Sequence, residues 1–377
     1  MNKIKLFIVV NVDWAFLLHR LHIAVEAQKK GYDVTIVTFD TGKVDEIKKY
    51  GLKCISHPIS RGGTNIFKEM KGFLFLLKLY LSEKPQIVHH VGLKLFLYGS
   101  LAALVSNISV VNALSGLGYL FTENNNGVLK SFLFSTINIF IKTKNVKYIF
   151  QNEDDKRVLQ KYFSKITDNN CVLIKGSGVD LNDFSYHIEP NTAQIQVLFS
   201  GRILREKGVQ EYIDAANTLR NRVEGKVEFI LAGKLDDQNP TAFTEKEIND
   251  FLIPNYIIWI GDQTDIKKVI EKSNIVVLPS YREGLPKSLI EACAIGRPII
   301  TTNVPGCKEV VMDNYNGYLV PVRNSNLLAK RIFELVENKS LRIRMGINSR
   351  KLAESEFSLD YVVTEHLRLY EYLVNLR

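Results

Sequence analysis

At 377 residues, with 46% hydrophobic and 24% charged residues, the chain is long enough for two globular domains and is neither a disordered nor a fibrous protein. Its formal net charge is +9, and residues 1–185 carry all of this excess, with 24 Lys and Arg against 15 Asp and Glu. This asymmetry indicates an anionic partner for the first half (a nucleic acid, a membrane surface or a phosphorylated substrate), although a lysine-rich surface alone would give the same charge. Four scattered cysteines, without a CxxC pair or a Cys/His cluster, argue against a disulfide framework or a structural zinc and favour a cytoplasmic protein.

Short apolar, β-branched runs alternate with amphipathic stretches along the whole chain. The runs predict strands at residues 5–10, 34–39, 87–89, 109–113, 148–151 and 171–174, and then at 196–200, 227–232, 257–260, 275–278, 298–302 and 317–320. Helical patterns lie between most of them, for example at residues 19–30, 154–161, 209–220, 264–273 and 288–295. Such alternation predicts parallel sheets covered on both faces, so the predicted fold class is α/β. No apolar run reaches the roughly 18–20 residues of a membrane span, and the run at 6–10 is too short for a signal peptide.

The series of strands restarts near residue 195, after a polar, proline-bearing stretch at residues 185–194 that is typical of a linker. We therefore predict two doubly wound, Rossmann-like domains facing across a cleft. Residues 1–185 form the first and residues 190–355 the second, and a C-terminal helix at 356–377 packs back on the first domain. In such sheets ligands bind at the carboxyl ends of the strands, so the loops that follow strands are the places to search for chemistry.

The segment from Ser280 to Glu291 carries the strongest chemical signal. A predicted strand ends just before a Glu-Gly-Leu-Pro turn, and a helix starts near Lys287, which places free backbone N–H groups where an anion or sugar hydroxyls can bind. Glu283 lies at the mouth of the turn, and Glu291 follows about two helical turns deeper on nearly the same face. The two carboxylates are then placed to hold the two ends of one ligand. The structural alternative is a helix-capping Glu283 and a surface Glu291.

This segment resembles the retaining glycosyltransferases of family 4, whose GT-B fold consists of two facing Rossmann-like domains. The match is Glu283-Gly-Leu-Pro-Lys-Ser-Leu-Ile-Glu291, followed by Gly296-Arg-Pro298 and by residues 302–309, and the resemblance extends over essentially the whole chain. It implies that Glu283 contacts the donor sugar and Glu291 the ribose of the nucleotide. The backbone of Gly284, Leu285, Pro286 and Lys287 would bind the sugar and the phosphates.

A second motif follows the predicted strand at residues 196–200. The family has a Gly-Arg turn here and a lysine five residues after the arginine, and Arg202 and Lys207 match those positions. The resemblance implies that both cations, as catalytic residues with Glu283, neutralise the charge that develops on the departing nucleoside diphosphate. An isolated Arg/Lys pair would instead be a solvated surface pair. No cofactor and no metal is then expected, and Asp236 and Asp237 are expected to cap a loop. Three glycines at strand ends, Gly201, Gly233 and Gly261, are expected to shape the donor pocket.

The first domain is expected to bind the acceptor. Residues 11–20, 60–64 and 112–118, together with Lys94, resemble a subgroup of bacterial O-antigen, capsule and N-acetylgalactosaminyl-diphosphoundecaprenol-pathway transferases. Many family members have a first-domain histidine that contacts the reacting sugar, but this chain has Asn112 and Ser115 in that region. The acceptor-side candidates are His19, Arg20, His89, Lys94, Asn112 and Ser115. A packed core histidine is the alternative for His89.

The resemblance implies transfer of a hexosyl group, N-acetylgalactosamine or another N-acetylhexosamine, from a UDP-linked donor to an undecaprenyl-diphosphate-linked sugar, with retention of configuration. Residues 67–81 and 129–142 mix large apolar residues with lysines, as interfacial helices do, although core helices with a lysine-bearing face are equally compatible. With the basic first half, they predict peripheral contact with the anionic inner face of the cytoplasmic membrane. The alternatives are a nucleotide-sugar epimerase of the same fold and a basic nucleic-acid-binding protein, for which the sequence shows no recognised module.

Overall fold

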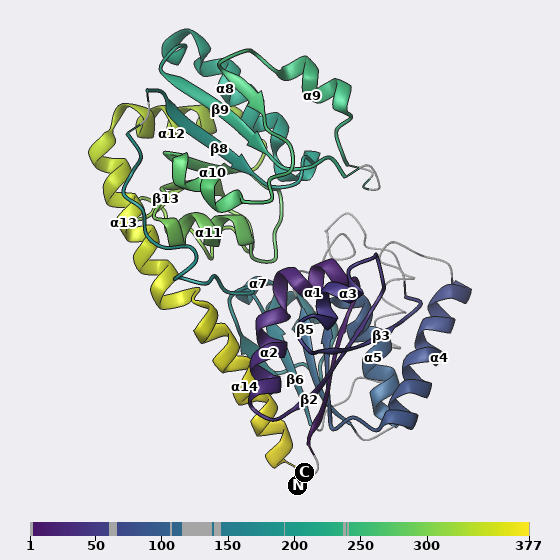
Figure 1. The fold of residues 1–377 in the computed structure, drawn as a ribbon. Coiled ribbons are helices and arrows are strands. Elements are labelled where there is room, and N and C mark those ends of the chain that lie inside the picture. The colour runs from purple at the N-terminus through teal and green to yellow at the C-terminus, as the bar shows by residue number, and fades with distance from the viewer. Residues whose placement is uncertain are drawn as a thin grey trace. The chain divides into compact units, whose positions relative to one another are not determined.

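The structure is a computed structural model that describes residues 3–59, 66–105, 108–114, 138, 145–191, 193–236, 239 and 241–376. Its contacts divide the chain into two compact units (Figure 1). Unit 1 comprises Met1–Ser177 and Tyr361–Arg377, and unit 2 comprises Gly178–Asp360. None of the helices in the described part of the chain is long and apolar enough to cross a membrane.

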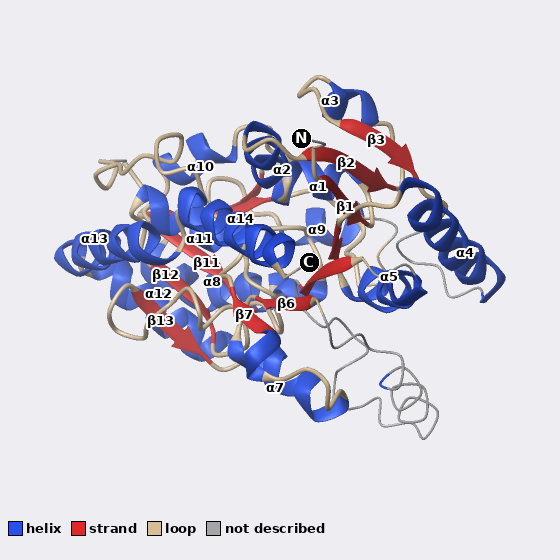
Figure 2. Cartoon of the chain, turned by 90° about the horizontal axis from the view of Figure 1, so that it is seen from below, coloured by secondary structure: helices blue, strands red, loops and turns tan. Residues whose placement is uncertain are grey.

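Unit 1 is built on a seven-stranded parallel sheet with the order β3-β2-β1-β4-β5-β6-β7. The strands are β1 (Lys5–Val10), β2 (Asp33–Thr38), β3 (Lys53–Ser56), β4 (Ile87–Val91), β5 (Ser109–Leu114), β6 (Val146–Phe150) and β7 (Cys171–Leu173). β1, β2 and β3 lie side by side in Figure 2. The six predicted strands of this half are confirmed with small shifts at their ends. β3 was not predicted, because a four-residue edge strand that is only partly buried has no apolar run to reveal it.

Helices cover both faces of this sheet. They are α1 (Asp13–His19), α2 (Leu21–Lys29), α3 (Val44–Lys48), α4 (Ile66–Glu83), α5 (Leu93–Val105), α7 (Glu153–Tyr162) and α14 (Leu359–Asn375). α2 and α14 lie on one face, and α4 and α5 lie on the other (Figure 1). The helix predicted at residues 19–30 is wrong at its start, because a separate helix, α1, ends at His19 and α2 begins after Arg20.

Unit 2 contains a six-stranded parallel sheet with the order β10-β9-β8-β11-β12-β13. The strands are β8 (Ile195–Ser200), β9 (Val227–Ala232), β10 (Ile257–Trp259), β11 (Ile275–Leu278), β12 (Ile299–Thr302) and β13 (Gly317–Val320). Its helices are α8 (Val209–Val223), α9 (Glu245–Phe251), α10 (Ile266–Lys272), α11 (Lys287–Ile295), α12 (Ser325–Glu337) and α13 (Lys339–Glu356). The six strands predicted here are confirmed, because β9, β11 and β12 are apolar runs buried in the sheet and even the partly buried edge strand β10 is apolar.

The strand order sets the place of a ligand site in each unit. In unit 2 the chain runs outward from β8 in one direction through β9 and in the other through β11, so the order reverses between β8 and β11. In unit 1 the same reversal falls between β1 and β4. Doubly wound sheets bind ligands at the carboxyl ends of the strands that flank this point. The loops after β8 and β11 are therefore the expected site in unit 2.

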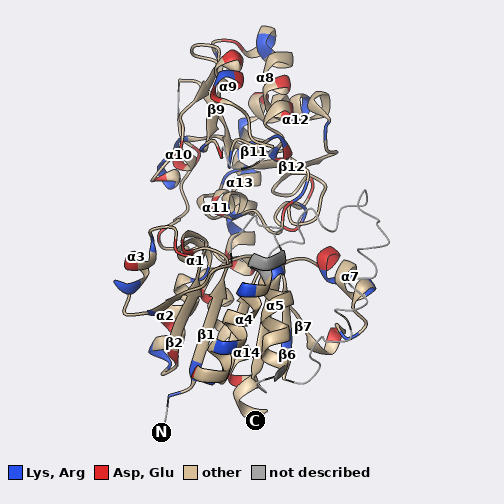
Figure 3. Ribbon diagram, turned by 90° about the vertical axis from the view of Figure 1, so that its right-hand side faces the viewer, with Lys and Arg blue, Asp and Glu red and all other residues tan. Residues whose placement is uncertain are grey.

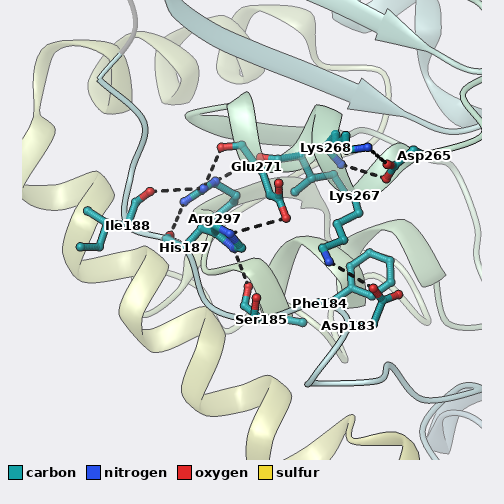
Figure 4. Close-up of polar contacts among 12 residues, drawn as sticks. Asp183, Phe184, Ser185, His187, Ile188, Asp265, Lys267, Lys268, Glu271 and Arg297 are labelled. Atoms are coloured by element: carbon teal, nitrogen blue, oxygen red, sulfur yellow. Dashed lines mark hydrogen bonds and ion pairs between the residues drawn. The ribbon is translucent and has the colours of Figure 1, made fainter.

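The segment predicted to be a linker, residues 185–194, is held firmly on unit 2 by Arg297. This buried side chain donates to the carbonyl oxygens of His187 at 2.9 Å, Ile270 at 3.2 Å and Glu271 at 3.0 Å (Figure 4). A second buried arginine, Arg342, forms an ion pair with Glu189. Burial lowers the pKa of Arg297 to about 10, so its guanidinium stays charged at neutral pH and donates to main-chain carbonyls.

Replacing Arg297 by methionine is expected to lower the free energy of unfolding of unit 2 by about 2–4 kcal/mol, because buried carbonyl groups lose their donors. Urea unfolding followed by Trp259 fluorescence in a Trp14→Phe background measures this unit alone, since these are the only two tryptophans. Arg344→Met, on the exposed side of α13, is the control and should change stability by less than about 0.5 kcal/mol. Equal stabilities of the two variants would contradict the anchoring role of Arg297.

Candidate functional site

The loops after β8 and β11, residues 201–208 and 279–286, are joined at the carboxyl edge of the unit 2 sheet. The backbone N–H of Tyr281 donates to the carbonyl oxygen of Glu206 at 2.9 Å. Gly208 has φ +75°, and a Cβ atom there would lie 2.2 Å from the carbonyl oxygen of Pro279, so a glycine is required where the loops meet. The close contact brings two predicted catalytic residues, one from each loop, together.

Lys207 and Glu283 form an ion pair between the two loops, and both side chains are largely buried. The hydroxyl of Ser280 donates to Glu283 Oε1 at 2.7 Å, so two donors orient this carboxylate. The helix-capping alternative for Glu283 is wrong, because Pro286 is the N-cap of α11 and the Glu283 carboxylate binds Lys207 and Ser280 instead. Glu283 is instead held in front of the helix, with Lys207 as its cationic partner.

Arg202 follows β8 and pairs with Asp236, which follows β9, at 2.7 Å between Nη1 and Oδ2. The side chains are 32% and 21% exposed, so the pair is accessible and a second anion can compete for the guanidinium. This pairing adds to the loop-capping role predicted for Asp236, whose carbonyl oxygen accepts from the N–H of Asn239 at 2.7 Å, and Asp237 lies outside the described residues. Nothing in the sequence pattern connected Asp236 with Arg202, since 34 positions separate them.

Glu291 lies one turn along α11 from Lys287, and its carboxylate is 3.7 Å from the lysine ammonium group. It is buried, so the surface alternative for this residue is wrong. Burial raises the pKa of Glu291, and the nearby Lys287 opposes that rise. The start of α11 thus places one cation beside one buried carboxylate.

The segment between Glu283 and α11 is packed against unit 2. Leu285 is partly buried against the core, and Pro286 starts the helix with its fixed φ. A Cβ atom on Gly306, which has φ +81°, would lie 2.5 Å from the carbonyl oxygen of Gly284, so the loop after β12 supports this turn from behind. The turn is therefore fixed by backbone packing.

Three predicted pocket glycines hold the ends of neighbouring strands together. The N–H of Gly233 donates to the carbonyl of Gly261 at 2.8 Å, and that of Gly201 donates to the carbonyl of Ala232 at 3.0 Å. A Cβ atom on Gly233 would lie 1.8 Å from the carbonyl oxygen of Gly201. Trp259 donates a hydrogen bond from Nε1 to the carbonyl of Gly233 at 2.8 Å, which further connects the ends of β9 and β10. The glycines shape the edge without offering side chains.

Two acceptor-side candidates in unit 1, His89 and Asn112, have no exposed surface. His89 Nδ1 is 2.7 Å from the hydroxyl of Tyr370, and Asn112 Oδ1 is 2.9 Å from His90 Nδ1. Both side chains lie inside the core, between the sheet and its covering helices. A side chain without accessible surface cannot contact an acceptor, so the structure contradicts these two predictions, and the packed-core alternative for His89 fits.

The other acceptor-side candidates are placed differently. His19 contacts the hydroxyl of Ser177 at 3.2 Å, and Lys94 lies partly exposed in the first turn of α5. Ser115 and residues 60–64 lie outside the described part, as do residues 129–142 except Asn138. Arg20, between α1 and α2, is 3% exposed, and burial lowers its pKa to about 10.

Arg20 donates to the carbonyl oxygen of His19 at 3.0 Å, whereas its Nε is buried without a hydrogen-bond partner. No carboxylate of the described residues pairs with it. Arg20 is a buried charge beside the buried His89 and His366, so it has almost no accessible surface with which to make the acceptor contact predicted from the sequence.

The sequence missed Ser280, although its position three residues before Glu283 was a signal that a hydroxyl could reach the carboxylate. It also missed Asp236 as a partner of Arg202, for which the sequence held no signal. Within the residues that the structure describes, no group of three or more His, Cys, Asp and Glu side chains is arranged to hold a metal ion.

Comparison with known proteins agrees with this architecture. The family model described as "Glycosyl transferases group 1" matches residues 183–352, and "Glycosyl transferase 4-like" matches residues 5–152. The crystal structure of Anabaena Alr3699/HepE in complex with UDP and glucose superimposes with a TM-score of 0.77 at 15% identity, over 98% of this chain and 100% of that one. The two Rossmann-like units are therefore those of the GT-B fold.

Relatives of nearly the same length have related descriptions. One is the N,N'-diacetylbacillosaminyl-diphospho-undecaprenol alpha-1,3-N-acetylgalactosaminyltransferase of Campylobacter jejuni, 26% identical over 94% of this chain and 95% of the relative. Another is the capsular polysaccharide biosynthesis glycosyltransferase CapM of Staphylococcus aureus, 28% identical over 98% and 97%. Together the two family models cover residues 5–152 and 183–352, and they show that the chain belongs to the glycosyltransferases.

Proposed function

We propose that this glycosyltransferase moves a hexosyl group, N-acetylgalactosamine or another N-acetylhexosamine, from a UDP-sugar to a sugar hydroxyl on an undecaprenyl-diphosphate-linked acceptor. The reaction serves the synthesis of a surface polysaccharide such as O-antigen or capsule, and it retains the anomeric configuration. The observation that carries the proposal is the Lys207–Glu283 pair, supported by Ser280, at the carboxyl edge of β8 and β11. The description of the Campylobacter jejuni relative supports the N-acetylgalactosaminyl group and the undecaprenol-diphosphate-linked acceptor, and that of CapM supports a role in surface polysaccharide synthesis.

The residues fit the chemistry of this transfer. The bond from the anomeric carbon to the diphosphate breaks, the bond to the acceptor oxygen forms on the same face, and the hydroxyl proton passes to the departing diphosphate. Arg202 and Lys207 neutralise the charge that develops on that leaving group. Glu283 accepts hydrogen bonds from the sugar, and Glu291 accepts them from the ribose. With these cations in place, the proposal includes no metal and no other cofactor.

On the acceptor side, we propose that the partly exposed His19 and Lys94 make polar contacts with the lipid-linked acceptor. Ser115 remains a candidate from the sequence alone.

The proposal is tested with a panel of UDP-sugars and a synthetic polyprenyl-diphosphate-linked acceptor sugar. We expect acceptor-dependent transfer from UDP-N-acetylgalactosamine or another UDP-N-acetylhexosamine, with unchanged rate in EDTA and an α-linked product by NMR. An inverted product would overturn retention, and loss of activity in EDTA would overturn metal independence. Release of an epimerised nucleotide sugar without acceptor would instead identify an epimerase.

We also propose that α4 of unit 1 contacts an anionic membrane at the cytoplasmic face. Met70, Leu74 and Leu81 are each about half exposed and lie within roughly 40° of one another around the helix. Lys71 and Lys78 flank this stripe and are exposed, and Figure 3 shows the basic and acidic positions in blue and red. Large apolar residues beside lysines are typical of interfacial helices.

Flotation with phosphatidylglycerol vesicles at low salt is expected to recover the wild-type protein, and binding should weaken as ionic strength rises. Replacing Leu74 and Leu81 together by serine should lower the bound fraction several-fold. Tyr372→Ser, which removes an exposed apolar side chain from α14, is the control. Absence of wild-type binding at low salt would refute the membrane contact while leaving the transfer reaction untouched.

A further inference from the structure

Tyr281, two residues before Glu283, points its side chain to α8. Its hydroxyl donates to Glu211 Oε1 at 2.6 Å, and Glu211 is only 9% exposed. The guanidinium of Arg323 lies over the Tyr281 ring, 5.0 Å from its centroid. Tyr281, in the loop after β11, thus contacts both the buried carboxylate of Glu211 and the guanidinium of Arg323.

The hydrogen bond to Glu211 is stronger than an ordinary surface contact. A hydroxyl that donates to a carboxylate makes a charge-assisted bond. The second carboxylate oxygen, Glu211 Oε2, is buried and has no hydrogen-bond partner in the described structure. Loss of the tyrosine hydroxyl would therefore leave the buried carboxylate poorly satisfied, which is costly.

Tyr281 holds the donor loops at two points. Its main-chain N–H binds the carbonyl of Glu206, the residue before Lys207, and its side chain binds α8, which begins at Val209. Glu283 and Lys207 lie on either side of this connection and form their ion pair across it. The relative position of the two groups thus depends on Tyr281.

We propose that Tyr281 is a positioning residue of the transfer reaction, which fixes the loop after β11 on α8 through Glu211 so that Glu283 and Lys207 face the donor in reactive geometry. The inference rests on the proposed function of this site. Misplacement of reacting groups by about 1 Å can lower a rate about 100-fold, so a contact behind the site is sufficient to control turnover.

The test compares Tyr281→Phe with wild type in kcat, in KM for the donor and in thermal stability. We expect kcat per folded protein to fall about 10- to 100-fold, with a smaller change in KM, because the ring stays under Arg323 and only the alignment is lost. Adding Glu211→Gln to this variant should restore part of kcat, since a neutral amide tolerates burial without the hydroxyl better than a carboxylate does.

Tyr318→Phe is the matched control. Tyr318 on β13 lies under Arg331, whose guanidinium is 4.3 Å from the ring centroid, and Arg331 in turn pairs with Glu334 on α12. This arrangement is chemically similar but belongs to neither donor loop. We expect loss of the Tyr318 hydroxyl to change the stability of the protein and to leave kcat unchanged.

Glu283→Gln, assayed in parallel, distinguishes failure of the proposed donor site from failure of the positioning role of Tyr281. Normal turnover of Glu283→Gln would overturn the proposed donor site itself. Impaired turnover of Glu283→Gln with normal kcat for Tyr281→Phe would overturn only the inference on Tyr281. A Tyr281→Phe variant that loses activity solely in proportion to its loss of folded protein would overturn it as well.

Discussion

Alanine at Arg202 or at Lys207 is expected to lower turnover about 100- to 1,000-fold, corresponding to roughly 3–4 kcal/mol of lost transition-state stabilisation. Both cations lie on the loop after β8, and each pairs with a carboxylate, Arg202 with Asp236 and Lys207 with Glu283. The charge on a departing diphosphate develops as the reaction proceeds, so removal of either cation should lower kcat more than it raises KM.

Steady-state kinetics with saturating acceptor measures both variants, and Arg205→Ala is the control within the same loop. Arg205 is half exposed, pairs with Glu247 and stacks over Phe243, so its charge is directed away from Lys207 and Glu283. The Arg205→Ala variant should therefore retain near-normal turnover. A near-normal rate for either Arg202→Ala or Lys207→Ala would show that the assignment of that residue is wrong.

Acid is expected to unfold unit 1 well before unit 2. Four buried histidines of unit 1 are kept neutral: burial lowers the pKa of His366 to about 3 and that of His90 to about 4, and it also lowers the pKa values of His89 and His57. Of the seven histidines in the chain, only His187 belongs to unit 2, and it is partly exposed. The pH dependence of stability should therefore differ sharply between the units.

The direction in which the stability of unit 1 changes with pH follows from the protons that the folded and unfolded states bind. Between the unfolded pKa, about 6.5, and the lower folded pKa, the unfolded state binds a proton that the folded state does not. The stabilisation by a neutral buried histidine is thus complete above about pH 6.5 and is lost as the pH falls towards the folded pKa. Each histidine costs up to about 1.4 kcal/mol per pH unit, so four cost up to about 5.5 kcal/mol per unit, against total stabilities of roughly 5–15 kcal/mol.

Urea unfolding at pH 7, 6 and 5 measures this loss. Trp259→Phe leaves Trp14 as the reporter of unit 1, and Trp14→Phe leaves Trp259 as the reporter of unit 2. His366→Phe keeps a ring in the core and should reduce the pH slope of unit 1 by about one quarter. His22→Gln, on the exposed face of α2, should leave the slope unchanged. Parallel pH dependence of both units would contradict the role of the buried histidines.

The sequence predicted most strands and the donor loops because both depend on local patterns. The strands of unit 2 are apolar runs buried on both faces, and such runs stand out from their surroundings. The sequence did not reveal β3, because a short, partly buried edge strand has the composition of a loop. The start of α2 was placed too early, since the short helix α1 before it has no capping side chain to mark its beginning.

The acceptor-side predictions were less successful for a physical reason. His89 and Asn112 were chosen for their place in the chain, near the ends of strands, but whether such a side chain faces a ligand or a covering helix depends on which helices pack there. Tyr370, which contacts His89, comes from the other end of the chain. Contacts over such separations leave no local signal.

By itself, the sequence determined that the chain is α/β, that a carboxylate and two cations follow particular strands of its second half, and that the first half carries the basic excess. These properties follow from residue type and spacing along the chain. Only the tertiary structure decided that Glu283 pairs with Lys207, that Asp236 pairs with Arg202, and that Tyr281 is anchored on Glu211. Parallel strands bring the loops after β8, β9 and β11 to one edge, and the partner of each charge is chosen by that proximity, which the distance along the chain does not reveal.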